Sequence, residues 1–219
     1  SHSLIPAHKI EDLLTSLHLV QEAVEKGYYA AGFLSYESAP AFDSAFKVRE
    51  GGTFPLLWFG LFSNPEHETQ SSSGEYTVGK WKPSITMEEY NQAISSIKKS
   101  IEDGITYQTN YTIRLHSPFN GDGLAFYNRL KKAQNCNYCA YIHTGDHSIL
   151  SASPELFFHL INGKITTKPM KGTIERGTTS EEDAANANWL LHSEKNRAEN
   201  LMIVDLLRND LGMIAQSGT

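Results

Sequence analysis

The sequence contains few cysteines. Its 219 residues include two, Cys136 and Cys139, which form a single C-x-x-C. A zinc site takes a full tetrahedral set of ligands, and although His143 and His147 could complete one, they follow within a stretch typical of a strand. A redox dithiol is typical of a helix N-terminus, whereas Cys139 begins a strand-like segment. We therefore interpret both cysteines as buried structural thiols.

Positive charge is also scarce. Lys and Arg total 19 against 25 Asp and Glu, the formal net charge is −6, and the basic residues are scattered along the chain. Binding to nucleic acid depends on basic groups that neutralise phosphates. We therefore expect no nucleic-acid partner.

Long apolar runs are missing as well. No stretch approaches the roughly 20 apolar residues that cross a bilayer, so we expect no membrane partner. The first residues, Ser1 to Leu4, lack the basic region and apolar stretch of a secretory signal, and we expect a cytoplasmic protein. With 40% hydrophobic and 11% aromatic residues, the chain still has ample material for a packed core.

Apolar periodicity predicts the helices and strands. Residues 10–26 place apolar side chains at intervals of three and four, which is typical of an amphipathic helix. Thr86 and Glu89 form a T-x-x-E capping box, which predicts a helix that ends at Gly104. Residues 107–113 alternate between two kinds of side chain, which predicts a strand with two distinct faces. We also expect helices over residues 124–132, 181–191 and 194–211, and strands over residues 28–36, 55–62, 76–80, 138–142, 148–153, 156–161 and 164–170.

The order of these elements predicts an α+β fold. Runs of strands are set apart from helices, with neither an internal repeat nor the regular strand-helix alternation of a doubly wound sheet. Asn162-Gly163 is a strong hairpin signal between the last two strands. We place a domain boundary near Pro83, with an N-terminal α+β subdomain over residues 1–83 and a second domain over residues 84–219.

Three segments in the last third of the chain contain the residues most typical of chemistry. They place a carboxylate, an amine and a second carboxylate in a sequence rich in apolar residues, where ionisable groups are costly and often functional. The segments are Ser153-Pro154-Glu155, Lys168-Pro169-Met170-Lys171-Gly172-Thr173 and Arg197-Ala198-Glu199-Asn200.

In order and spacing, these segments resemble the chorismate-utilising enzymes. The resemblance is specific from about Lys80 onward. It implies a two-sheet sandwich flanked by helices, about twice the length of the part that follows Pro83. We therefore expect a chain that is truncated before the C-terminal half, with residues 84–219 forming the first half of the chorismate-binding catalytic domain.

Lys171 is the residue that discriminates within this family. A lysine at this position is typical of the aminodeoxychorismate synthases, whereas anthranilate synthases carry alanine. A lysine attacks a substrate only when its amine is uncharged, and desolvation or a nearby cation such as Lys168 favours that state. On composition alone a solvated turn lysine is the favoured interpretation, because most lysines near glycines are surface groups, and only the resemblance implies a nucleophile.

Two carboxylates complete the predicted catalytic residues. The apolar residues after Glu155 favour its neutral form, which suits a general acid that protonates a leaving hydroxyl; an ordinary loop carboxylate is the alternative. Glu199 shares a predicted helix face with apolar residues, and a carboxylate buried on such a face needs a cation to balance its charge. The resemblance implies Mg²⁺, with a second metal-binding glutamate beyond the end of this chain, and an ion pair with Lys195, Arg197 or Arg208 is the alternative.

The resemblance also implies substrate contacts and a reaction. Gly172 and Thr173 match positions that contact the substrate carboxylate and ring. Gln108 stands where isochorismate-type relatives have a water-activating lysine, which argues against water as the nucleophile. The implied reaction converts chorismate and ammonia, supplied by a glutamine amidotransferase subunit, to 4-amino-4-deoxychorismate on the route to para-aminobenzoate and folate. The alternatives are an anthranilate synthase component I and a non-catalytic fragment.

Overall fold

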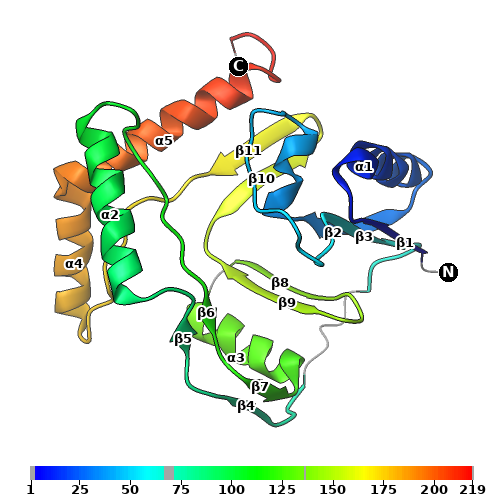
Figure 1. The fold of residues 1–219 in the computed structure, drawn as a ribbon, viewed down its shortest axis with the longest axis horizontal. Coiled ribbons are helices and arrows are strands. Elements are labelled where there is room, and N and C mark those ends of the chain that lie inside the picture. Colours follow the sequence, from blue (N-terminus) through cyan, green and yellow to red (C-terminus); the bar gives the residue numbers. More distant parts are fainter. Residues whose placement is uncertain (1–2, 67–71, 136, 219) are drawn as a thin grey trace. The chain divides into compact units, whose positions relative to one another are not determined.

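The computed structural model describes residues 3–66, 72–135 and 137–218. Contacts divide the chain into two compact units, Ser1–Ser71 and Ser72–Thr219 (Figure 1). Both units combine helices with antiparallel strands, so the predicted α+β class is confirmed. The domain boundary near Pro83 stays a prediction.

The first unit is a small sheet covered by a helix. Three antiparallel strands pair in the order β1-β3-β2, and α1 packs against all three of them (Figure 1). The helix predicted from residue 10 is confirmed, and it ends just before Gly27, whose φ of 91° favours glycine. The elements are β1 (Ser3–Ala7), α1 (Ile10–Glu25), β2 (Tyr29–Leu34), the short 3-10 helix η1 (Tyr36–Ala41) and β3 (Leu57–Phe62).

The core of this unit forms where α1 meets the sheet. Ala7, Leu13 and Leu57 make one buried cluster, and both leucines are completely inaccessible to solvent. Leu13 comes from α1, whereas the other two come from paired strands, because Ala7 lies opposite Leu57 in the register of β1 and β3. This cluster therefore joins the helix to the sheet.

We expect Leu13→Ala to destabilise the first unit by about 2–5 kcal/mol, because it removes a fully buried side chain and leaves a cavity. Leu14→Ala is the matched control, since Leu14 is the next residue of α1 and is 47% exposed. Amide hydrogen exchange in β3 measures both variants. Equal acceleration in the two variants would contradict the core assignment.

The second unit contains four antiparallel two-stranded ladders and four helices in the described ranges. Helix α3 packs against β4, β8 and β9, and α4 contacts α5. The strands pair as β4 (Tyr76–Val78) with β7 (Phe119–Gly121), β5 (Lys82–Pro83) with β6 (Leu115–His116), β8 (Tyr138–His143) with β9 (Ser148–Ser153), and β10 (Leu156–Ile161) with β11 (Lys164–Lys168). The helices are α2 (Met87–Glu102), α3 (Gly123–Gln134), α4 (Ser180–His192) and α5 (Glu194–Gly212).

The capping box at the start of α2 is confirmed. Thr86 Oγ1 accepts a hydrogen bond from the Glu89 amide at 3.2 Å, and the Glu89 carboxylate accepts one from the Thr86 amide at 2.7 Å. These reciprocal bonds satisfy two donors that a helix N-terminus leaves free. The bonds from Thr86 hold the pKa of Glu89 below its ordinary value, so this cap is complete at neutral pH.

The strand predicted over residues 107–113 is wrong. This segment has no regular secondary structure, and the next strand, β6, begins at Leu115. Two hydrogen bonds with Ser84 hold Arg114, the residue that follows this segment. The Ser84 amide donates to the Arg114 carbonyl at 2.8 Å, and the Ser84 hydroxyl accepts from the Arg114 amide at 3.2 Å. Alternation predicts a strand only where another strand supplies the pairing, and in the described residues this segment has none.

Two expectations that rest on what the sequence has little of can be compared with the structure. Cys139 lies in β8, as predicted, but it is half-buried, and Cys136 lies outside the described residues. None of the helices in the described ranges combines the length and apolar composition needed to cross a membrane.

Candidate active site

The β10–β11 hairpin brings two of the predicted segments together. Asn162 and Gly163 have φ values of 50° and 76°, the left-handed pair that a tight two-residue hairpin turn requires. The strands run antiparallel, with Leu156 opposite Lys168. Glu155 directly precedes β10, and the chain leaves β11 at Lys168 toward Lys171, so both segments lie at the same end of the hairpin.

A hydrogen bond fixes Glu155 beside the residue before Lys171. The Met170 amide donates to Glu155 Oε1 at 3.0 Å, across the open end of the hairpin. The Glu155 amide in turn donates to Ser153 Oγ at 3.2 Å, which holds the turn that presents the carboxylate. Lys171 is half-buried and lies in the irregular loop between β11 and α4. The predicted acid and the predicted nucleophile are thus neighbours through Met170.

The apolar surroundings expected for Glu155 are not found. The residue is exposed, and Phe157 and Phe158 after it are 82% and 51% exposed. The physical reason is that β10 pairs with β11 alone in the described part of the chain, so its apolar side chains are not covered by a further layer. Glu155 is positioned by hydrogen bonds rather than by burial.

Gly172 connects the loop to α5. Its φ is 77°, and a Cβ built there would lie 3.0 Å from both Cβ and Oδ1 of Asn196. The positive φ favours glycine, because other residues rarely adopt it, and a Cβ would also force the Asn196 side chain to shift. Asn196 is itself fixed, since its Nδ2 donates to Ser193 Oγ at 2.9 Å. Thr173, the next residue of the loop, is exposed.

The contact with Asn196 also links the loop to Glu199. The two residues lie three positions apart on α5, so they share one helix face. Asn196 is a residue that the sequence reasoning missed. Its position three residues before a candidate ligand was a usable signal, but its contact with Gly172 depends on tertiary packing.

Of the three ion-pair partners that the sequence allowed for Glu199, Lys195 is the one that lies within ion-pair distance in the described part of the chain. Its Oε1 lies 4.0 Å from Lys195 Nζ, and the two side chains are 36% and 83% exposed. A long and exposed pair of this kind contributes little to stability. The pair therefore leaves the carboxylate available for another cation.

The residues present fit Mg²⁺ as an incomplete protein site. The described residues contain no group of three or more His, Cys, Asp or Glu side chains arranged to hold a metal ion. Mg²⁺ does not need such a cage, because it is usually held by one or two carboxylates together with water and an anionic substrate. Glu199, partly exposed and on the face that touches the loop, fits one of those carboxylates.

Gln108 does not lie on the strand expected for it. It is half-buried in the irregular segment before β6, and its backbone carbonyl accepts a hydrogen bond from Thr106 Oγ1 at 3.0 Å. An amide cannot act as a general base, so the chemical argument against water activation by this residue is independent of the strand.

Comparisons with known proteins support the family that the sequence resembles. A family model described as chorismate binding enzyme matches residues 6–219. Aminodeoxychorismate synthase component 1 of Escherichia coli K12 is 36% identical over 155 residues, covering 70% of this chain and 34% of that protein. The Bacillus subtilis protein of the same name is 38% identical over 143 residues, covering 65% and 30%.

Anthranilate synthases are similar too. Component 1 from Methanothermobacter marburgensis is 31% identical over 213 residues, covering 86% of this chain and 46% of that protein. The crystal structure of anthranilate synthase component I from Streptococcus pneumoniae TIGR4 matches with a TM-score of 0.68 and 24% identity, covering 86% of this chain and 51% of that one. This likeness shows the fold.

The chain thus spans about a third of the length of the aminodeoxychorismate synthase components that it matches. The family match covers nearly all of the chain, and the fold agrees with it. The chain belongs to the chorismate-binding enzyme family.

Proposed function

We propose that this chain is part of an aminodeoxychorismate synthase component 1, which converts chorismate and ammonia to 4-amino-4-deoxychorismate. The proposal is supported by Lys171 in its Pro-Met-Lys-Gly-Thr context and by relatives of that name. The observation that carries it is the hydrogen bond from the Met170 amide to Glu155, because it holds a carboxyl group next to the lysine.

Lys171 and Glu155 have the roles of nucleophile and acid in the proposed reaction. Nζ of Lys171 forms a bond to C2 of the ring, the ring double bonds shift, and the C4–O bond breaks while Glu155 donates a proton, so that water leaves. Ammonia then forms a bond to C4, the double bonds shift back, and the C2–N bond breaks. Loss of one proton from the new ammonium group returns Glu155 to its acid form.

Glu199, Gly172 and Thr173 bind the substrate in this proposal. Glu199 would hold Mg²⁺, which would supply positive charge for a substrate carboxylate. Gly172 allows the backbone to approach the substrate closely, since it has no side chain. The exposed hydroxyl of Thr173 is available as a hydrogen-bond donor to the second carboxylate or the ring oxygens.

Ammonia reaches the site from a partner in this proposal. The relatives are named component 1, which says that they act with another component. A glutamine amidotransferase subunit is the partner that we propose, because it releases ammonia from glutamine.

The product tests the proposal against an anthranilate synthase. The full natural protein is incubated with chorismate, Mg²⁺ and an ammonium salt, and the products are separated and identified by mass spectrometry. We expect 4-amino-4-deoxychorismate as the main product, because Lys171 occupies C2 while ammonia enters at C4. Anthranilate as the main product would overturn the assignment.

Calorimetry separates both enzymes from a non-catalytic fragment. Chorismate and Mg²⁺ are titrated into this chain and into the full natural protein. We expect binding by the full protein, with weaker or no binding by this chain, since Glu199 supplies only part of the metal site. Absence of binding to both proteins would count against any chorismate enzyme.

A further inference from the structure

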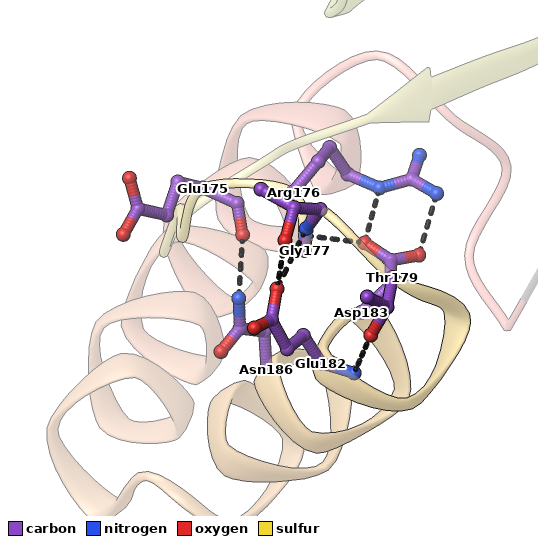
Figure 2. A network of polar contacts seen from close by, with 8 residues as sticks. Glu175, Arg176, Gly177, Thr179, Glu182, Asp183 and Asn186 are labelled. Carbon is purple, nitrogen blue, oxygen red and sulfur yellow. Dashed lines mark hydrogen bonds and ion pairs between the residues drawn. The ribbon is translucent and has the colours of Figure 1, made fainter.

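The far end of the loop that carries Lys171 is held by a carboxylate of α4. Arg176 donates from Nε and Nη2 to the two oxygens of Asp183, both at 2.6 Å, and the Gly177 amide donates to Oδ1 at 3.0 Å (Figure 2). We call these three residues the loop clamp. A two-pronged arginine–carboxylate pair fixes direction as well as distance.

Neighbouring residues of α4 hold the same stretch of loop. The Asn186 side-chain amide donates to the Glu175 carbonyl at 3.0 Å (Figure 2). The Thr178 amide donates to Glu182 Oε2 at 2.9 Å. Thr179 caps the helix, because its hydroxyl accepts from the Glu182 amide at 3.2 Å. In the described part of the chain, hydrogen bonds made or accepted by side chains of α4, rather than a backbone ladder, define the end of this loop.

Gly177 shows how closely the loop follows the helix. A Cβ built at this position would lie 2.1 Å from the Asp183 backbone nitrogen and 2.6 Å from the Glu182 carbonyl carbon. No side chain fits there, so the loop backbone passes directly against the backbone of α4. The loop and the first turn of α4 are therefore in close contact at the position where Asp183 binds the loop.

The clamp is charged at neutral pH. The hydrogen bond from Arg176, followed by that from the Gly177 amide, holds the pKa of Asp183 below its ordinary value of 3.8. The same pair raises the pKa of Arg176.

We propose that Asp183, acting through Arg176 and Gly177, is a positioning residue for Lys171. The loop has two fixed ends, with Glu155 bound to Met170 and Asp183 bound to Arg176 and Gly177. Lys171 and its neighbours lie between these ends. The consequence for catalysis rests on the proposed function, whereas the coupling between the two ends of the loop does not.

The exposure of the clamp separates positioning from stability. The Arg176 and Asp183 side chains are 88% and 31% exposed, so solvent screens their charges and limits what even this two-pronged pair contributes to folding. Removing the pair is therefore expected to leave the protein folded. A small displacement of a reacting group, in contrast, lowers the rate of the chemical step strongly.

The first test needs no substrate. NMR measures amide exchange in Asp183→Asn and in Glu181→Gln, the matched control, because Glu181 lies in the same first turn of α4 and receives none of the loop bonds described above. We expect exchange at Gly177 and at the distant Met170 to rise at least about threefold in Asp183→Asn, and neither to change in the control. Unchanged exchange at Met170 would overturn the proposal.

The second test measures catalysis in the full natural protein. We expect Asp183→Asn and Arg176→Ala each to lower kcat about tenfold or more, with the KM for chorismate changed less than about twofold. The double variant is expected to match the poorer single variant, because both substitutions break one interaction. Additive losses, a change confined to KM, or a fall in melting temperature that accounts for the lost activity would contradict positioning.

The two tests fail separately. If the full natural protein makes no 4-amino-4-deoxychorismate, the proposed function fails. The exchange measurement still decides whether the loop clamp holds the loop at Met170. A protein that makes 4-amino-4-deoxychorismate with unchanged kcat in both variants retains the proposed function and loses the positioning role of Asp183.

Discussion

Lys171→Ala is expected to abolish the covalent chorismate adduct and to lower formation of 4-amino-4-deoxychorismate by about a thousandfold or more in the full natural protein. The alanine cannot form the bond to C2 that directs ammonia to C4. Any amination that remains is expected at C2. Intact-protein mass spectrometry of quenched reactions measures the adduct, and chromatography identifies the product.

Lys164→Ala is the control for this variant. Lys164 is an exposed lysine at the start of β11, in the same hairpin, and the proposed reaction assigns it no role. We expect wild-type adduct and product from this variant. An adduct that survives Lys171→Ala would remove the lysine from the mechanism, whereas loss of product in both variants would point to damage to the hairpin.

Glu199→Gln is expected to have the second largest effect, weakening Mg²⁺-dependent binding of chorismate by about a hundredfold. Glutamine keeps the size of the side chain and removes the charge that holds the metal ion. Calorimetry with chorismate over a series of Mg²⁺ concentrations measures the loss. The dependence on Mg²⁺ should disappear along with the affinity.

Lys195→Met distinguishes a metal ligand from an ion-pair partner. This substitution removes the ammonium group 4.0 Å from Glu199 and keeps an unbranched side chain on α5. If Glu199 binds the metal, Lys195→Met retains Mg²⁺-dependent binding. Equal losses in Lys195→Met and Glu199→Gln would mean that the carboxylate serves the ion pair alone.

Features set by neighbouring residues could be predicted from the sequence. The capping box of α2 needs only Thr86 and Glu89, and the hairpin needs only the left-handed turn at Asn162-Gly163. Because the hairpin fixes the separation of its two ends, the proximity of Glu155 to the loop of Lys171 followed from the same signal. The first part of the candidate site was therefore predictable.

Features that depend on distant partners could not be predicted. Residues 107–113 alternate like a strand, but pairing depends on another strand, and the segment remains irregular. The exposure of Glu155 depends on what covers β10, which its own sequence does not specify. Two further features join segments whose approach is set by the packing of α4 and α5. They are the close approach of Gly172 to Asn196 and the ion pair between Asp183 and Arg176.

The most direct test is a crystal structure of the full natural protein with Mg²⁺ and chorismate. The account predicts Nζ of Lys171 against C2 of the ring, the carboxyl group of Glu155 beside the C4 oxygen, and Glu199 bound to the metal ion at a substrate carboxylate. A structure in which the ring binds elsewhere, with Lys171 directed into solvent away from both carboxylates, would contradict it.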